Sequence, residues 1–250
     1  MIFALITQTA FAAPDETHKY PAGDGSDLSV HAFLPDKSTR SGKAAIFYFG
    51  GGWRVGSPEQ FFPFCQALKT RGIACFAPDY RVSSRQGTDP IDALHDAQSA
   101  YQWLVSKADE FGVDKSQIYV GGGSAGGHLA AAVTLLPNKS ITQAPAGMLL
   151  FNPAVDIGRS SRIQEMFRNQ AEQYSPIEFV RPSLPGAWIV HGTADKIVPH
   201  STVVDFCQRM ESAGNQCQLT SFDDAGHGFF NAGRPAYDRV LTALLAHLDR

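Results

Sequence analysis

Residues 117–128 read Gln-Ile-Tyr-Val-Gly-Gly-Gly-Ser-Ala-Gly-Gly-His, and this stretch decides the fold. Residues 117–120 have the pattern of a short buried strand, and residues 125–136 have that of a helix. Between them, residues 122–126 fit the pattern G-x-S-x-G, with Ser124 at its centre. A sharp strand-to-helix turn needs small neighbours, because Cβ atoms at the flanking positions would clash. The stretch therefore predicts that Ser124 is presented as a nucleophile after a strand.

Short apolar segments alternate with amphipathic segments along the whole chain. Strands are expected at residues 28–34, 44–49, 73–77, 117–120, 147–151, 187–190 and 217–222. Helices are expected at residues 57–70, 90–111, 125–136, 199–213 and 235–248, with a short helix near 163–173. This alternation predicts an α/β fold in which a mostly parallel eight-stranded sheet carries helices on both faces. The two leading strands, which tight turns join, are expected to form an antiparallel edge.

The composition suits one large globular domain. The chain has 250 residues, of which 44% are hydrophobic and 18% are charged, so it can fill a core. No linker divides it, and we expect a single domain over residues 14–250 with a small insertion at 156–184 and no large cap domain. Lys and Arg number 21 against 24 Asp and Glu, so no basic excess favours a nucleic acid partner. No apolar run approaches the ~20 residues of a membrane span, and membrane insertion is not expected.

The N-terminal residues have the pattern of the end of a secretory signal peptide. Residues 2–13 read Ile-Phe-Ala-Leu-Ile-Thr-Gln-Thr-Ala-Phe-Ala-Ala, an apolar run followed by small residues. Ala10-Phe11-Ala12 fits the A-x-A cleavage pattern, with cleavage near Ala12 or Ala13. We therefore expect residues 1–13 to be a signal peptide remnant and the protein to be periplasmic or secreted. The alternative is an ordinary apolar N-terminus, because the positively charged start of a signal peptide is missing.

Four cysteines form two pairs with equal spacing. Cys65 and Cys75 are ten residues apart, and so are Cys207 and Cys217. An exported protein could oxidise both pairs. However, a helix packed on a sheet usually holds its Cα atoms too far from the strand for a disulfide, so buried thiols remain an equal alternative. No C-x-x-C motif and no zincin-like histidine pair occurs in the sequence, so a metal site is not expected.

A serine nucleophile needs a general base, and the base needs a group that orients it. His227 lies in a Gly-flanked loop after the last expected strand, and Asp195 lies in the loop after the strand before it. We predict that Ser124, Asp195 and His227 form a catalytic triad, because this chain order is the α/β-hydrolase order. All three follow the carboxyl ends of strands, where sites in open α/β sheets lie. Asp156, which follows another strand, is the alternative acid.

Three glycines after the strand at residues 44–49 predict an oxyanion hole. Without side chains, the loop at residues 50–52 lets backbone N–H groups approach a tetrahedral oxyanion. We expect the donors to be the N–H groups of Gly51, Gly52 and Ala125. The loop resembles the HGGG motif of the hormone-sensitive-lipase-like carboxylesterases. Phe49 stands where that motif has histidine, so the usual histidine hydrogen bonds of the loop are absent, while the main-chain donors should keep their function.

Five motifs in order make the chain similar to secreted serine esterases of the α/β-hydrolase superfamily. They are FGGGW at 49–53, DYR at 79–81, GGSAGGHLA at 122–130, HGTADKIVP at 191–199 and GHGFF at 226–230. Within that superfamily the chain most resembles the acetyl-xylan/feruloyl esterase-like (BD-FAE-like) group, over residues 28–250. The resemblance implies formation and hydrolysis of an acyl-enzyme, with His227 as base and then acid, and no cofactor. We interpret Asp79 and Arg81 as structural, in a buried ion pair or a turn brace.

The leading interpretation is a secreted acetylesterase that removes O-acetyl groups from a polysaccharide or oligosaccharide such as xylan. A broad short-chain carboxylesterase and a feruloyl esterase are the alternatives within the same chemistry. A catalytically silent binding protein on the hydrolase fold is the alternative from another class. Trp53, Arg54 and Phe229 neighbour the expected machinery and are candidate substrate contacts. The sequence carries no prediction of the oligomeric state.

Overall fold

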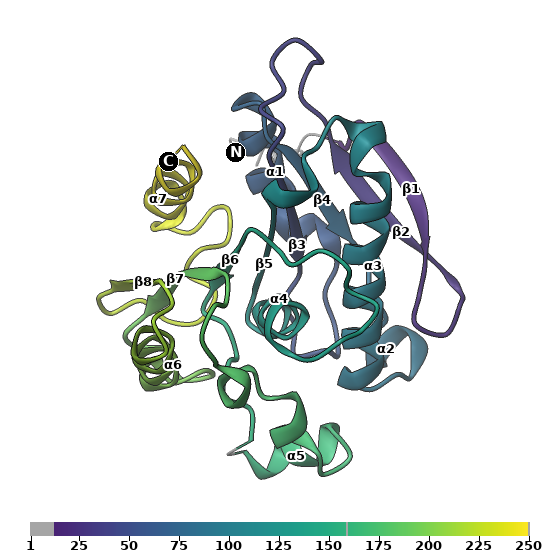
Figure 1. Cartoon of the computed structure of the whole chain (residues 1–250). Coiled ribbons are helices and arrows are strands. Elements are labelled where there is room, and N and C mark those ends of the chain that lie inside the picture. The colour runs from purple at the N-terminus through teal and green to yellow at the C-terminus, as the bar shows by residue number, and fades with distance from the viewer. Residues whose placement is uncertain (1–12, 159, 250) are drawn as a thin grey trace, which may run out of the picture.

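The computed structural model describes residues 13–158 and 160–249 (Figure 1). One eight-stranded sheet runs through it in the order β1-β2-β4-β3-β5-β6-β7-β8. The strands are β1 (Glu16–Pro21), β2 (Asp27–Phe33), β3 (Ala44–Tyr48), β4 (Ala74–Pro78), β5 (Ile118–Gly123), β6 (Gly147–Phe151), β7 (Gly186–Gly192) and β8 (Cys217–Phe222). The six neighbouring strands β4, β3, β5, β6, β7 and β8 are parallel to one another. Strand β2 is antiparallel to β4, and β1 is antiparallel to β2. The predicted mostly parallel α/β sheet of eight strands is confirmed.

Two details at the N-terminal edge differ from the sequence prediction. The eighth strand, β1, lies outside the expected strands because only one of its six residues, Tyr20, is buried. The prediction that the strand at 44–49 belongs to an antiparallel edge is wrong, since β3 lies between β4 and β5 and is parallel to both. All five residues of β3 are buried, as expected of a strand in the middle of a parallel sheet. The antiparallel edge is formed by β1 and β2.

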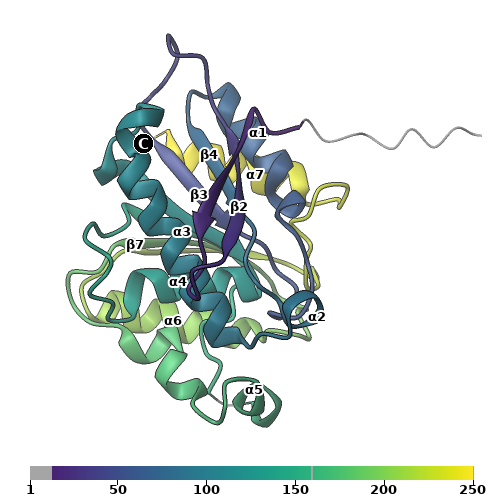
Figure 2. The ribbon, with the colours of Figure 1, turned by 90° about the vertical axis from the view of Figure 1, so that its right-hand side faces the viewer.

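Helices cover both faces of the sheet, as Figures 1 and 2 show. On one face, α3 (Pro90–Phe111), α4 (Ala125–Leu135) and α6 (His200–Ser212) enclose the larger core cluster. On the other face, η1 (Pro58–Phe61), α1 (Phe62–Thr70) and α7 (Tyr237–Leu248) enclose the second. The short α2 (Ser83–Gln86) and η2 (Lys115–Gln117) lie in connections. None of the helices in the described part of the chain is long and apolar enough to cross a membrane.

The segment at residues 156–184 follows β6 and therefore lies at the carboxyl end of the sheet. Its helices are short: α5 (Ser161–Met166), η3 (Ala171–Tyr174) and η4 (Pro176–Phe179). In Figures 1 and 2 the part around α5 projects from one end of the molecule. The expectation that no large cap domain covers the sheet is confirmed for the described residues.

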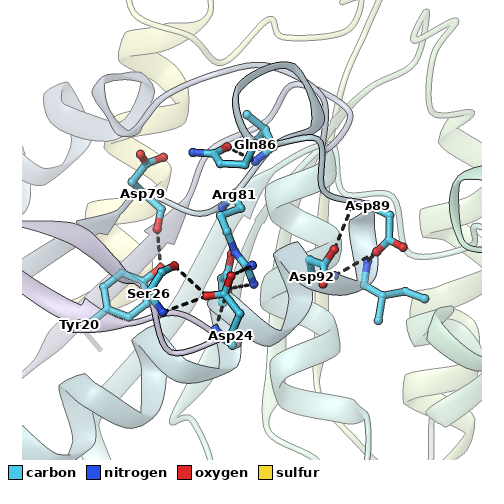
Figure 3. Close-up of polar contacts among 12 residues, drawn as sticks. Tyr20, Asp24, Ser26, Asp79, Arg81, Gln86, Asp89 and Asp92 are labelled. Atoms are coloured by element: carbon cyan, nitrogen blue, oxygen red, sulfur yellow. Dashed lines mark hydrogen bonds and ion pairs between the residues drawn. The ribbon is translucent and has the colours of Figure 1, made fainter.

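An almost fully buried arginine joins the first hairpin to the sheet and to α3 (Figure 3). The guanidinium of Arg81 donates to both oxygens of Asp96, over 2.9 and 2.8 Å, and also to Asp24. The Asp96 carboxylate, which is 0% exposed, further accepts the N–H groups of Gly23 and Arg81. An ion pair between Asp79 and Arg81 does not form, because Asp79 pairs with Arg85. The interpretation of both residues as structural stands, with different partners.

Both cysteine pairs form disulfides. Cys65 of α1 is joined to Cys75 of β4, and Cys207 of α6 to Cys217 of β8. Their Cα atoms are 5.0 and 5.3 Å apart, within the normal range for a disulfide. A short turn leads from each helix directly into the strand beside it, so the usual helix-to-sheet separation does not apply. The proposed signal peptide remnant lies almost entirely outside the described residues.

The buried ion pair generates a stability prediction. Asp96→Ala should lower the free energy of unfolding by about 3–5 kcal/mol, because it leaves Arg81 buried with only the half-exposed Asp24. The double variant Arg81→Met/Asp96→Leu should recover the part of that loss that comes from the unpaired charge, because it removes both buried charges, while the N–H groups of Gly23 and residue 81 still lack the Asp96 acceptor. Urea unfolding of the three proteins measures both effects. A loss below about 1 kcal/mol in the single variant would contradict this account.

Candidate active site

The turn that presents Ser124 is strained and tightly packed. Ser124 lies between β5 and α4 with φ at 54° and ψ at −116°, a backbone conformation that non-glycine residues rarely adopt. A Cβ on Gly126 would lie 2.0 Å from the carbonyl oxygen of Tyr48, and one on Gly122 would lie 2.4 Å from that of Gly126. Glycine is therefore required on both sides of the serine for α4 to begin against the end of β3.

The structure brings together the three residues predicted to form the triad. His227 Nε2 lies 2.9 Å from Ser124 Oγ, and His227 Nδ1 lies 2.7 Å from Asp195 Oδ2. A carboxylate only accepts hydrogen bonds, so its partner Nδ1 carries the proton and Nε2 has a free lone pair. That lone pair is in position to accept the hydroxyl proton of Ser124. The arrangement can therefore convert a serine hydroxyl into a nucleophile.

Asp195 is held rigidly at the end of β7. Its side chain is fully buried, and its Oδ1 accepts the N–H groups of Ile197 and Val198 at 2.9 and 3.0 Å. His191 Nε2 lies 3.4 Å from Asp195 Oδ2. Burial lowers the pKa of His191, although the charge of Asp195 acts in the opposite direction. His191 is therefore neutral near pH 7 and donates to the carbonyl of Val198, which leaves His227 as the group that Asp195 orients.

The alternative acid lies elsewhere. Asp156 is half-buried and lines a surface cavity together with Glu172 and Glu178, whereas the carboxylate that hydrogen-bonds to His227 belongs to Asp195. Among the residues that the structure describes, no cluster of three or more His, Cys, Asp or Glu side chains could hold a metal ion.

The glycine loop after β3 presents backbone N–H groups that can donate hydrogen bonds. Gly51 and Gly52 have φ angles of 126° and 63°, and a Cβ on Gly51 would lie 2.0 Å from the carbonyl oxygen of Val55. The Gly50 N–H donates to Gln60 Oε1 over 2.6 Å. Within residues 13–158 and 160–249, the N–H groups of Gly51 and Gly52 have no hydrogen-bond acceptor. They therefore remain free to bind a developing oxyanion.

Phe49 is braced by an aromatic neighbour in place of the histidine contacts of the HGGG motif. Its ring stacks on Tyr80, with centroids 4.0 Å apart and planes 11° from parallel. The hydroxyl of Tyr80 also donates to the carbonyl of Phe49 over 2.7 Å. The same residue thus holds both the side chain and the main chain at the start of the loop.

The three candidate substrate contacts have different environments. Arg54 is exposed at the rim of the glycine loop. Trp53 is only 4% exposed and packs edge-on against His128 and Phe167. Phe229 is buried against core aromatic residues, and this placement does not support a contact with substrate.

Sequence reasoning missed Asn152, which lies directly beside the imidazole of His227. Asn152 directly follows β6, has a φ of 37° and is fully buried. Its Nδ2 lies 3.3 Å from His227 Nδ1 and 3.5 Å from Nε2. Asparagine adopts positive φ more readily than most residues, so the Asn-Pro pair at residues 152–153 was a usable signal for this turn. The sequence also carries no motif that marks Gln60.

Comparisons with known proteins agree with this fold. A family model described as alpha/beta hydrolase fold matches residues 45–181, and the dienelactone hydrolase family model matches residues 174–245. The esterase LipC of Mycobacterium tuberculosis is 29% identical over 78% of this chain and 55% of its own length. An acetylxylan esterase of Xylanibacter ruminicola is 25% identical over 88% of this chain and 48% of its own length. The chain thus spans about half the length of these curated relatives.

A solved structure is similar over nearly the full length of both chains. It is a thermophilic esterase from Thermogutta terrifontis with propionate bound, which is 38% identical and superposes with a TM-score of 0.87 over 93% of each chain. The same esterase has also been solved with butyrate bound and after phosphoramylation by tabun.

The buried histidine behind the nucleophile predicts an acid sensitivity. Burial lowers the pKa of His128 to about 4, with a smaller opposing effect from its hydrogen bond to the Tyr174 carbonyl. In the unfolded chain its pKa is about 6.5, so between these values the unfolded state binds more protons and stability falls as pH falls. At about pH 5 this histidine should cost about 2 kcal/mol of stability relative to about pH 7.5.

The variant His128→Gln, which can still donate to the Tyr174 carbonyl, should lose less stability over the same pH range. Urea unfolding of both proteins at the two pH values measures the difference, and the other titrating groups cancel in the comparison. An equal loss in both proteins would show that His128 does not stay neutral in the fold.

Proposed function

This chain belongs to the alpha/beta hydrolase fold family and groups with its esterases, and we propose that it is a serine carboxylesterase that hydrolyses short-chain acyl esters. The observation that carries the proposal is the hydrogen-bonded series Ser124–His227–Asp195, over 2.9 and 2.7 Å. It lies beside backbone N–H groups that have no other acceptor among the described residues.

In the proposed reaction His227 Nε2 takes the Ser124 hydroxyl proton while Oγ bonds to the acyl carbon. The carbonyl oxygen becomes an oxyanion, which the N–H groups of Gly51, Gly52 and Ala125 stabilise. When the bond to the alcohol breaks, the imidazolium of His227 returns the proton to the leaving oxygen. Water then enters by the same route, with His227 again as base and then acid, and releases the carboxylic acid. Asp195 keeps the imidazole oriented and stabilises its positive form.

The preference for short acyl chains rests on two supports. The similar esterase of Thermogutta terrifontis has been solved with propionate and with butyrate bound. In this chain the segment at residues 156–184 forms only short helices, which leaves little protein to enclose a long acyl chain. The bound acids of the similar esterase favour a broad short-chain carboxylesterase over a dedicated glycan enzyme, whereas the short helices bear only on the length of the acyl chain.

Removal of O-acetyl groups from a glycan such as xylan is the second candidate. Its support is the acetylxylan esterase of Xylanibacter ruminicola, at 25% identity, together with the small insertion, which suits a substrate attached to a polymer. We also propose a periplasmic or secreted location. The two disulfides support it, since disulfides persist mainly in oxidising compartments.

The triad assignment makes a ranked prediction. Ser124→Ala should remove nearly all turnover of p-nitrophenyl acetate, because no nucleophile remains. Asp195→Asn should lower kcat by about 10⁴-fold, because the amide favours the wrong tautomer of His227. Asp156→Asn is the matched control and should change kcat by less than about threefold. The reverse order of the two aspartate variants would assign the acid to Asp156.

The substrate class is separated by a second measurement. Wild-type protein should hydrolyse p-nitrophenyl acetate, propionate and butyrate with kcat/KM values within about tenfold of one another, and octanoate more slowly. Acetate release from acetylated xylan, with Ser124→Ala as the blank, tests the second candidate. Efficient release from the polymer would place the glycan activity first, and absence of turnover on every ester would contradict the proposed function.

A further inference from the structure

Two amide side chains connect the glycine loop to the histidine loop. The Gly50 N–H donates to Gln60 Oε1 over 2.6 Å, and Gln60 Nε2 donates to Asn231 Oδ1 over 2.9 Å. Asn231 Nδ2 in turn donates to the carbonyl of Gly228 over 2.9 Å. This amide bridge, formed by Gln60 and Asn231, thus runs without interruption from the residue before Gly51 to the residue after His227.

The direction of every hydrogen bond in the amide bridge is set by its two ends. A backbone N–H can only donate, so Gln60 must present its oxygen to Gly50. A backbone carbonyl can only accept, so Asn231 must present its nitrogen to Gly228. The contact between the two side chains is then necessarily from Gln60 Nε2 to Asn231 Oδ1. If the oxygen and nitrogen of either side-chain amide were exchanged, two donors or two acceptors would face each other.

Both members of the bridge are anchored in the core by the residues beside them. Phe61 follows Gln60 and Phe230 precedes Asn231, and both rings are almost fully buried. The two rings stack at 25° with their centroids 6.0 Å apart. The side chains of the bridge are therefore held at a fixed separation by packing as well as by their hydrogen bonds.

The amide bridge spans the two halves of the proposed machinery. Its first end lies in the loop after β3, and its second lies in the loop after β8. In the sheet these strands are separated by β5, β6 and β7, so no strand pairing fixes one loop against the other. The reaction requires the oxyanion donors and the base to be positioned around the same carbonyl group, and small displacements there are costly.

We propose that Gln60 and Asn231 are positioning residues for the esterase reaction, a role that rests on the proposed function. Through Gly50 and Gly228 they hold the donors Gly51 and Gly52 at a fixed place relative to His227. They touch neither substrate nor the reacting atoms. Loss of the bridge therefore acts on transition-state stabilisation, and KM changes little.

The test compares Gln60→Glu with Gln60→Met. The ionised carboxylate of the first variant still accepts from Gly50 but cannot donate to Asn231, so kcat on p-nitrophenyl acetate should fall roughly tenfold with KM within about twofold. The protonated carboxyl has both an acceptor and a donor, so the ratio of the variant's kcat to that of wild type should rise as pH falls. Gln60→Met lacks both groups, and its ratio should be low and independent of pH.

The matched control is Asn215→Asp. Asn215 also bridges two backbone groups, accepting from Leu184 N–H and donating to the Arg181 carbonyl. It lies just before β8, at the opposite end of the strand from the histidine loop. This variant should lose stability with kcat unchanged, which separates a destabilised fold from a displaced site.

Each outcome has a distinct meaning. The factor lost by Gln60→Glu should be the same for acetate and butyrate esters, because both share the acyl oxygen. Unchanged kcat in Gln60→Glu and Gln60→Met, with an active wild type, would overturn the inference and leave the proposed function intact. A pH-independent ratio for Gln60→Glu would also overturn it. A wild type inactive on every ester would instead overturn the proposed function.

Discussion

The contact between the start of α4 and the end of β3 is the constraint on which the site depends. A Cβ on Gly126 would lie 2.0 Å from the carbonyl oxygen of Tyr48 and 2.4 Å from that of Phe49. Only glycine allows this approach, and the approach places Ser124 and the N–H of Ala125 next to the loop that begins at Gly50. The proposed nucleophile and the proposed oxyanion donors are thus parts of one packing unit, fixed by main-chain contact.

The proposed base, His227, and the proposed acid, Asp195, come from the other half of the sheet and are positioned differently. β7 and β8 end near the same edge, and Asp195 is fixed there by two backbone N–H groups. His227 has a less enclosed position, with 19% of its side chain exposed, and it is oriented by Asp195. A rigid buried acid and a more accessible imidazole suit a group that must take and return protons.

Local patterns were enough to predict that Ser124, Asp195 and His227 lie together, because each lies in a short motif after an apolar strand. The same reasoning failed for β1, whose mostly exposed residues carry little hydrophobic signal. It also misplaced β3, although the complete burial of that strand is typical of a central position. The sequence could not decide whether the two cysteine pairs form disulfides, because disulfide formation depends on how tightly each helix turns back onto its strand.

The amide bridge could not be predicted from the sequence for a related reason. Gln60 and Asn231 are 171 residues apart, and each is an ordinary polar residue next to a buried phenylalanine. Their relation arises only when η1 and the loop after β8 pack on the same face of the sheet. Sequence motifs locate groups that react, whereas groups that position them are specified by tertiary packing.

Phe49 illustrates how a motif can lose a side chain while its geometry persists. The proposed oxyanion donors are main-chain N–H groups, so the chemistry requires a position of the backbone and not a particular residue at 49. Tyr80 supplies one restraint by stacking on Phe49 and donating to its carbonyl, and Gln60 supplies the next by binding the N–H of Gly50. The carbonyl and the N–H of the one peptide group that joins Phe49 to Gly50 are thereby held from different elements, so the loop can keep its conformation without a histidine.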